Sequence, residues 1–279
     1  MDYKIIVDSC CDMTPELAER LGVASVVPMT MMLGGKEFVD DERLDIPGFM
    51  DEMKACLERV SSAAPTPFAF MEAIGAAINS FVVTISSQLS ASYANAELGK
   101  SLAEEEGTAD VHVFDSKSAS AGEVLVAIKL RELLTANGIS KDQIISSVNQ
   151  FIDDMKTYFV LERYENLIKN GRLNKVTGKI VQILNVKLIM GSDGNGGIQL
   201  HAKPRGTQQM LDRLISLIRN SDKPTSGESM VICHCNNLPL ATQLSNAIKR
   251  HFDFREIFIV PTRGAISLYA DDKGIVLAF

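Results

Sequence analysis

The segment FVVTISSQLSASY, residues 81–93, carries the clearest structural signal in this chain. Its apolar first half predicts a buried β-strand, and the apolar residues that continue at helical spacing from Tyr93 predict a helix. The serines between them place hydroxyl groups and backbone N–H groups at a helix N-terminus, where the helix dipole is positive. Such a junction suits an anionic group, either a carboxylate or a phosphate.

Short apolar strands alternate with amphipathic helices along the rest of the chain, which predicts an α/β fold. In residues 1–156 the pattern favours an open, mainly parallel sheet with helical crossovers. In residues 157–279 it favours a mixed sheet with helices, including a hairpin around the glycine-rich turn at 193–197. We therefore expect two α/β domains, 1–156 and 157–279.

Capping residues mark several helix ends. Thr14 and Gly22 are expected to start and stop a first short helix, and Ser140 with Gln143 forms a capping box for a later one. The run of small and turn-forming residues at 61–67 predicts a loop.

Composition excludes several classes of protein. The 279-residue chain carries a net charge of −7, which disfavours nucleic acid as a partner because nucleic-acid binding needs a basic face. Its apolar runs are shorter than the ~20 residues that span a bilayer, so we expect no stable membrane insertion. Five cysteines, two of them adjacent at Cys10 and Cys11, favour reduced thiols and a cytoplasmic location.

Small hydroxyl and carboxyl residues follow three strands of the first half, at Asp8-Ser9, Ser86-Ser87 and Asp115-Ser116. The carboxyl ends of parallel strands share one edge of a sheet, where ligands bind. Six residues are therefore candidates to line one crevice: Ser9, Ser62, Ser90, Ser92, Asp115 and Ser116. The alternative for each is an ordinary helix cap.

Several motifs, in their order and spacing, resemble the DegV family of bacterial lipid-binding proteins. They are Val7-Asp8-Ser9, Pro65-Thr66-Pro67, residues 85–93, Asp115-Ser116, residues 169–173 and Lys203-Pro204-Arg205. The resemblance covers the whole chain and implies one long-chain fatty acid, bound non-covalently between two α/β domains, with no cofactor. In some members it implies a carrier that presents the carboxylate to a separate fatty acid kinase.

The resemblance also implies the residues that hold the carboxylate. The family uses a hydroxyl in the loop before a proline and a Ser-Gly-Thr triplet, which correspond here to Ser62 and to Ser90, Ala91 and Ser92. The Ala91 N–H can still donate, and Ser92 keeps the hydroxyl. Where the family usually shows a histidine before a Gly-Pro-Gly turn, this chain has Thr262, which we expect to take part of that role.

A fatty acid tail needs a dry tunnel, and burial of a 16-carbon tail is worth on the order of 10 kcal/mol. Methionine and phenylalanine are adaptable liners, although ordinary core packing is the alternative. The candidates are Met29, Met31, Met32, Phe68, Phe70 and Met71.

Basic residues gather in one part of the sequence: Lys169, Arg172, Lys175, Lys179, Lys203 and Arg205. They predict either a solvated face or a docking surface for an acidic partner, for which Arg172, Lys203 and Arg205 are the candidates.

A second interpretation is a small-molecule phosphotransferase, in which the serine cluster binds phosphate and Asp8 and Asp115 bind Mg²⁺. A metal site at Cys233-His234-Cys235 is disfavoured, because a strand points His234 away from the two cysteines. The sequence has neither a nucleophile elbow nor a phosphate-binding glycine loop. We therefore expect a binding protein rather than an enzyme, with no catalytic and no metal-binding residues.

Overall fold

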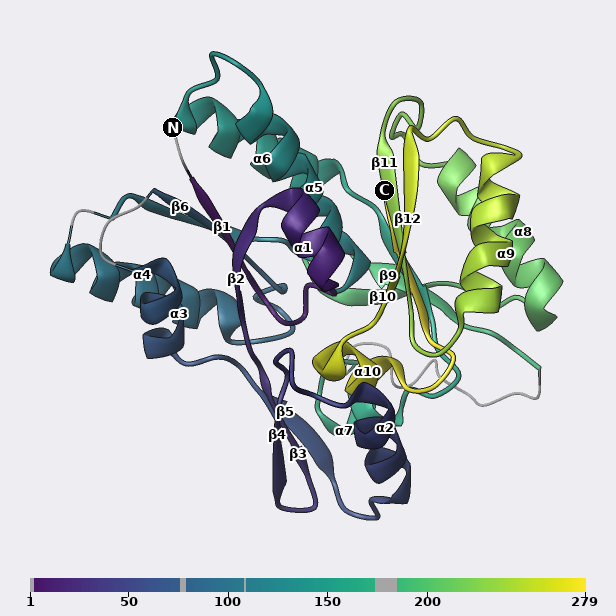
Figure 1. Cartoon of the computed structure of the whole chain (residues 1–279). Helices are drawn as coiled ribbons and strands as arrows, with labels where there is room; N and C mark the ends of the chain where they lie inside the picture. The colour runs from purple at the N-terminus through teal and green to yellow at the C-terminus, as the bar shows by residue number, and fades with distance from the viewer. Residues whose placement is uncertain (1–2, 76–78, 108, 174–184) are drawn as a thin grey trace.

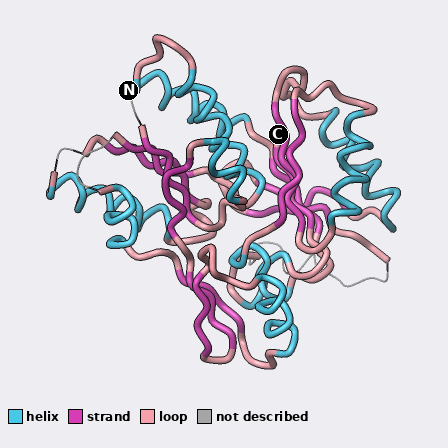
Figure 2. Tube along the Cα trace, viewed as in Figure 1, coloured by secondary structure: helices cyan, strands magenta, loops and turns pink. Residues whose placement is uncertain are grey.

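The computed structural model describes residues 3–75, 79–107, 109–173 and 185–279, and these residues form three β-sheets (Figures 1 and 2). A parallel sheet lies in the N-terminal part, a small antiparallel sheet projects beneath it in this view, and a mixed sheet forms the C-terminal part. The predicted α/β fold, with a parallel sheet followed by a mixed sheet, is confirmed.

The parallel sheet brings the carboxyl ends of its strands to one edge. Its order is β2 (Val23–Val27), β1 (Lys4–Asp8), β6 (Ser80–Thr84) and β7 (Val111–Asp115). Val7 pairs with Val83, and Val83 pairs with Phe114, so the three polar strand ends are in register. The inner strands are apolar on both faces because helices cover both faces.

Five helices pack on the parallel sheet. They are α1 (Pro15–Leu21), α3 (Pro67–Ile74), α4 (Ser92–Glu106), α5 (Ala121–Thr135) and α6 (Lys141–Asp154). Helices α3 and α4 cover one face, and α1, α5 and α6 cover the other. The predicted caps are confirmed: the Thr14 side chain accepts from Leu17 N–H, Gly22 ends α1 with φ +66°, and Ser140 and Gln143 form the capping box.

One strand of the small antiparallel sheet was not predicted from the sequence. The sheet has the order β4 (Lys36–Val39), β3 (Thr30–Leu33) and β5 (Val60–Ala63). The first part of 61–67, predicted as a loop, is thus strand β5, because Ser62 pairs with Met31 of β3. Helices α2 (Ile46–Ala55), α7 (Glu165–Lys169) and α10 (Gly264–Ala270) pack around this sheet.

The mixed sheet has six strands, in which β11 and β12 form the one parallel pair. Its order is β10 (Ile198–Ala202), β9 (Ile189–Ser192), β8 (Thr157–Val160), β13 (Ile275–Ala278), β11 (Ser229–His234) and β12 (Glu256–Pro261). Strands β9 and β10 form the predicted hairpin. Helices α8 (Gly206–Arg219) and α9 (Leu238–Lys249) cover one face.

Helix α5 belongs to a core that both large sheets share. It packs with Phe81 and Val83 of the parallel sheet and with Val231 and Val276 of the mixed sheet. Because this core is continuous between the two sheets, it marks no boundary between two domains. The predicted domain division between residues 156 and 157 therefore stays a prediction. Among the described residues, no helix is both long and apolar enough to cross a membrane.

Candidate functional site

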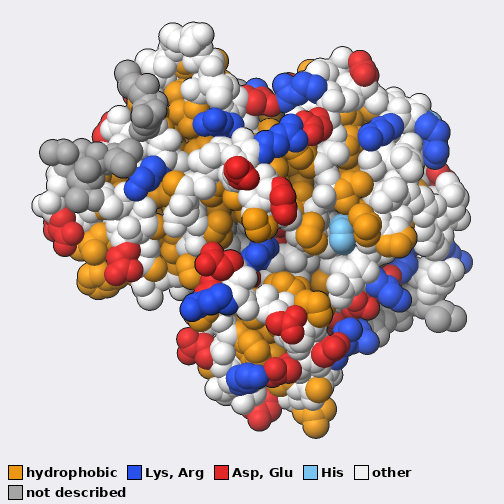
Figure 3. All heavy atoms as spheres, viewed as in Figure 1, with side chains coloured by type: hydrophobic (Ala, Val, Ile, Leu, Met, Phe, Trp, Pro, Cys, Tyr) orange, Lys and Arg blue, Asp and Glu red, His pale blue; other side chains and the backbone are white. Residues whose placement is uncertain are grey.

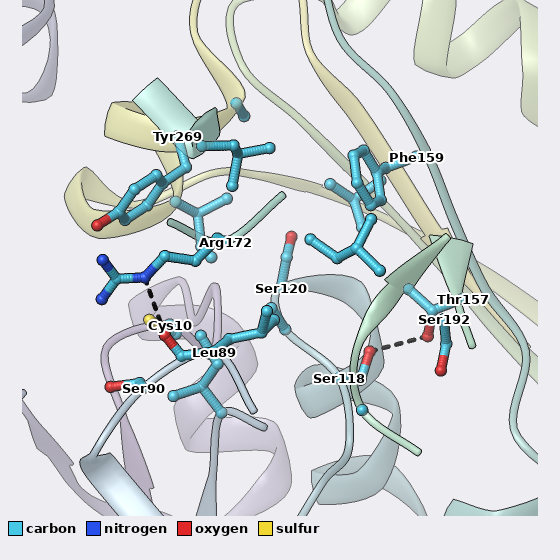
Figure 4. A pocket seen from close by; sticks show the side chains of 18 of the residues that line it. Cys10, Leu89, Ser90, Ser118, Ser120, Thr157, Phe159, Arg172, Ser192 and Tyr269 are labelled. Atoms are coloured by element: carbon cyan, nitrogen blue, oxygen red, sulfur yellow. Dashed lines mark hydrogen bonds between the residues drawn. The ribbon is translucent and has the colours of Figure 1, made fainter. Parts of the chain in front are cut away.

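A cavity of about 290 Å³ lies where the three sheets meet (Figure 4). Its wall combines the polar edge of the parallel sheet with residues of β5, β8, β9, β10 and β13, of α10, and of α7 and the segment after it. The wall is mainly apolar: Cys10, Met29, Ala64, Ile85, Leu89, Ala119, Phe159, Leu161, Leu167, Ile198, Ile266, Ala270 and Val276. A cavity of this kind, mostly apolar with few polar groups, is typical of a small-molecule site.

Four polar side chains gather at one end of this cavity. The Ser62 and Tyr269 hydroxyl oxygens lie 2.9 Å apart, and Ser90 and Arg172 complete the group. Arg172 donates from Nε to the Leu89 carbonyl at 3.1 Å and lies 5.7 Å from the centre of the Tyr269 ring (Figure 4). A fixed guanidinium beside hydroxyl groups favours an anionic head group at this end.

Asp8 holds the serine-rich loop in place from beneath. Its carboxylate accepts from Ile85 N–H at 3.0 Å, from the Ser92 hydroxyl at 2.5 Å and from Cys10 N–H at 2.9 Å. The Ser90 oxygen accepts from Ser92 N–H at 3.2 Å. The strand-to-helix junction therefore fixes the direction of the Ser90 side chain through buried hydrogen bonds.

The structure brings some of the predicted site residues to the cavity wall and not others. Ser62, Ser90 and Ala91 line the cavity. Ser92 is buried on Asp8, and Thr262 is buried with its hydroxyl 2.8 Å from that of Ser267, so neither reaches the wall.

The remaining crevice candidates stabilise loops instead. Ser9 accepts from Met29 N–H, and Ser116 donates to the Ser118 carbonyl. Asp115 accepts from the backbone and hydroxyl of Ser87. These three side chains form hydrogen bonds within and between loops, and none of them is the N-cap of a helix, so neither the crevice nor the helix-cap prediction describes them.

The sequence model of the DegV family, described as uncharacterised proteins, matches residues 2–279. The chain belongs to the DegV family. A DegV domain-containing protein of Streptococcus gordonii is 34% identical over 282 residues, which cover 100% of this chain and 99% of the relative.

Solved DegV structures are similar over the whole chain. A DegV family protein of Ruminococcus gnavus, refined with vaccenic acid, has a TM-score of 0.93 and 35% identity and covers 99% of both chains. The Fatty Acid Kinase (Fak) B3 protein of Streptococcus pneumoniae, loaded with linoleic acid, has a TM-score of 0.89 and 33% identity over 100% of this chain and 99% of its own.

Most of the residues predicted to line a fatty acid tail do not line the cavity of this DegV protein. Met29 lines the cavity. Met31 and Phe70 are buried in two different cores, and Met71 packs against the second of these. Phe68 is 64% exposed, and Met32 is half-buried on the small sheet. The alternative of ordinary packing therefore describes most of the set.

The sequence did not predict Tyr269 as a site residue, nor a second set of hydroxyl-bearing residues in the cavity wall. Ser118, Thr157 and Ser192 line the side of the cavity opposite Ser90, and Ser120 lies between the two sides (Figure 4). The Ser118 and Thr157 oxygens lie 2.8 Å apart. The spacing of serines in Asp115-Ser116-Lys117-Ser118 was the one signal that pointed toward this group.

The basic residues divide into two kinds. Arg172 lies in the cavity wall, whereas Lys169, Lys203 and Arg205 are exposed. Lys175 and Lys179 lie outside the described residues. Acidic and basic side chains are interspersed over the face in Figure 3.

The positions and hydrogen bonds of Asp8 and Asp115 do not favour the interpretation as a phosphotransferase. Asp8 and Asp115 accept hydrogen bonds from the chain, as described above. Among the described residues, the group with metal-ligand spacing is Asp8, Cys10 and Glu123, which does not include Asp115. Burial raises the pKa of Asp8 and raises that of Glu123 well above its ordinary value, so this buried pair favours a shared proton.

Proposed function

We propose that this protein binds one long-chain fatty acid non-covalently in the cavity between the sheets. The observation that carries the proposal is the cavity itself, with hydroxyl groups and a guanidinium at one end and a mainly apolar wall beyond them, in which the hydroxyl-bearing side chains are Ser118, Ser120, Thr157 and Ser192. The fatty acids that accompany the Ruminococcus and Streptococcus relatives support it.

In this proposal the carboxylate is held by Ser62 and Ser90, with the Ala91 N–H as a further donor. Arg172 supplies the positive charge, and charge-assisted hydrogen bonds are the stronger kind. Ser92 contributes indirectly. Its hydroxyl donates to Asp8 and its N–H donates to Ser90, and these bonds hold the loop that carries Ser90. Thr262 acts indirectly in this proposal, because its hydroxyl pairs with that of Ser267 in α10, the helix that carries Tyr269.

The tail extends along the apolar wall beyond Leu89. Each buried CH₂ contributes about 0.8 kcal/mol, so the tail supplies most of the affinity and the polar end fixes the register. A binding protein of this design needs no cofactor and no catalytic residue. The two-domain division at 156/157 and a cytoplasmic location are further parts of the proposal.

Presentation of the carboxylate to a separate fatty acid kinase is the finer form of the proposal. The similarity to the Fak B3 protein supports it. Exposed Lys203 and Arg205, together with Arg172 near the head group, are the proposed docking residues for an acidic surface of that kinase. If docking occurs there, a Lys203→Gln, Arg205→Gln variant binds fatty acid normally but supports slower acyl phosphate formation.

The first test is mass spectrometry of an organic extract of the purified, denatured protein. We expect one fatty acid per chain, with a length and unsaturation that report the preference of the cavity. An empty extract, together with no thermal shift on addition of fatty acids, would refute the proposal.

A further inference from the structure

Glu123 of helix α5 has a fully buried carboxyl group that the proposed fatty acid site does not use. The residue is 0% exposed, and within the described part of the chain neither carboxyl oxygen accepts a hydrogen bond. A charged carboxylate without donors is very unfavourable in a protein interior. The Glu123 carboxyl therefore needs either a proton or a bound cation.

The start of α5 explains why this carboxyl has no donor. Glu123 is at the third position of the helix, from which a glutamate commonly accepts from the N–H of the N-cap residue. Here the N-cap is Ser120, and its N–H lies near Glu123 but donates to the Cys10 carbonyl at 3.0 Å. The Ser120 hydroxyl donates to Asp12. The ordinary capping role is therefore not open to Glu123.

The polar partner of Glu123 is Asp8, and the two carboxyl groups are in hydrogen-bond contact. Two such groups in contact in an interior cannot both be ionised without a cation. Three donors favour the negative charge on Asp8: the Ile85 N–H, the Cys10 N–H and the Ser92 hydroxyl. Because Glu123 has no such donors among the described residues, the proton belongs to Glu123. Burial, and then the charge of Asp8, raise the pKa of Glu123 well above its ordinary value, which agrees with this assignment.

The Asp8 carboxylate joins segments that carry the polar end of the cavity. Asp8 ends β1, its partner Ile85 follows β6, and its partner Ser92 begins α4. The Ser92 N–H donates in turn to Ser90. A hydrogen bond from Glu123 to Asp8 therefore ties the whole junction to helix α5.

We propose that Glu123 is a positioning residue of the head-group site: as a neutral acid it donates a hydrogen bond to Asp8 and so holds the loop that carries Ser90. Its effect on the ligand rests on the proposed fatty acid binding, whereas its proton and its hold on the loop do not. Glutamine at this position would still donate to Asp8 through its amide. An apolar side chain of similar size would not.

Infrared difference spectroscopy of the full chain at neutral pH tests the proton on Glu123. A protonated carboxylic acid has a C=O stretch that is separate from the bands of ionised carboxylates. We expect the wild-type protein to show such a band that the Glu123→Gln variant lacks. The other buried acids Asp12 and Asp40 are present in both proteins. No lost acid band, the result expected if both carboxyls were ionised around a cation, would overturn the proposal.

Hydrogen exchange of the amides of residues 85–92 tests the hold on the loop. Glu123→Met should speed exchange there about tenfold, the effect of one lost hydrogen bond to a charged group, and Glu123→Gln should match the wild type. Val148→Ala is the control for a general loss of stability, because Val148 lies in the same core on helix α6. Wild-type exchange of residues 85–92 in the Glu123→Met variant would overturn the proposal.

Displacement assays with palmitic acid and methyl palmitate connect the loop to the ligand, since the ester keeps the tail and lacks the charge. We expect Glu123→Met to weaken binding of the acid about tenfold with little effect on the ester, and Glu123→Gln to bind both normally. Unchanged acid binding, or an equal loss for acid and ester, would overturn the positioning role. If the wild-type protein binds neither, the proposed function fails, and the infrared and exchange results still decide the proton and the hold on the loop.

Discussion

The hydroxyl oxygens of Ser62 and Tyr269 lie 2.9 Å apart at the polar end of the cavity, although 207 residues separate them in the sequence. Ser62 lies on strand β5 of the small sheet, and Tyr269 lies on helix α10 of the C-terminal half. The proposed head-group site is therefore assembled from segments far apart in the sequence, and a ligand held there would contact both of them.

Tyr269→Phe should weaken fatty acid binding about tenfold. The change removes a hydroxyl that positions Ser62 and can donate to the carboxylate, and one hydrogen bond to a charged group is worth roughly 1.5–3 kcal/mol. Displacement of a fluorescent fatty acid measures the affinity. Tyr93→Phe is the control, because Tyr93 lies on α4 outside the cavity wall. Unchanged affinity in Tyr269→Phe would remove Tyr269 from the site.

Ser90→Ala should weaken fatty acid binding by a similar factor without unfolding the protein. Ser90 lines the cavity, and its side chain accepts one hydrogen bond within the described part of the chain, from the nearby Ser92 N–H, so its contribution to folding is about 1 kcal/mol or less. Ser87→Ala is a matched control from the same loop, since Ser87 bonds to Asp115 away from the cavity. If both variants bind fatty acid equally well, Ser90 does not hold the carboxylate.

Asp12→Asn should reduce the pH dependence of stability. Burial raises the pKa of Asp12 from 3.8 to about 7, against the opposing hydrogen bonds from Ser120 and Arg263 N–H. A folded-state pKa above the unfolded value means that stability present at acidic pH is lost as pH rises toward 7. Because asparagine cannot ionise, the variant lacks the part of the pH dependence that comes from Asp12, about 2 kcal/mol of unfolding free energy between roughly pH 5 and pH 8.

Urea unfolding at the two pH values measures this effect. Exposed Asp142→Asn is the control and should keep the wild-type pH dependence. The same dependence in the Asp12→Asn and wild-type proteins would show that Asp12 is already ionised in the folded protein at both pH values.

The sequence predicted those parts of the site that depend on local chain geometry. The strand, serine cluster and helix at 81–93 are contiguous, so their pattern already places Ser90 at a helix N-terminus. The caps at Thr14 and Ser140 are local for the same reason.

The parts that were missed depend on contacts between distant segments. Strand β5 exists because Ser62 pairs with Met31 across the small sheet, and short polar strands have little local signal. Tyr269 reaches the cavity because Asp40, distant in sequence, accepts from the Gly264 and Ala265 N–H groups at the start of α10. Likewise, Ser92 carries a hydroxyl that could hold a ligand, but this hydroxyl points inward because it donates to buried Asp8.

The turn between β9 and β10 forms part of the cavity wall. Gly196 lies in the cavity wall with φ +87°, and its carbonyl accepts from the Ser86 hydroxyl at 2.8 Å. A Cβ added at Gly196 would lie 2.3 Å from the Ser86 oxygen. Gly194 has nearly the same φ, +88°, with nothing within 4 Å of an added Cβ. The two glycines therefore separate backbone strain from steric contact.

Gly194→Ala should lower the free energy of unfolding by about 1 kcal/mol, the cost of positive φ in a residue with a side chain. Gly196→Ala should cost roughly 1–3 kcal/mol more and should also weaken fatty acid binding, because the methyl group pushes the turn away from the cavity. Adding Ser86→Ala removes the clashing oxygen and should restore part of both losses. Equal destabilisation by the two glycine substitutions would show that the turn is free to move away from Ser86, and that this contact does not close the cavity.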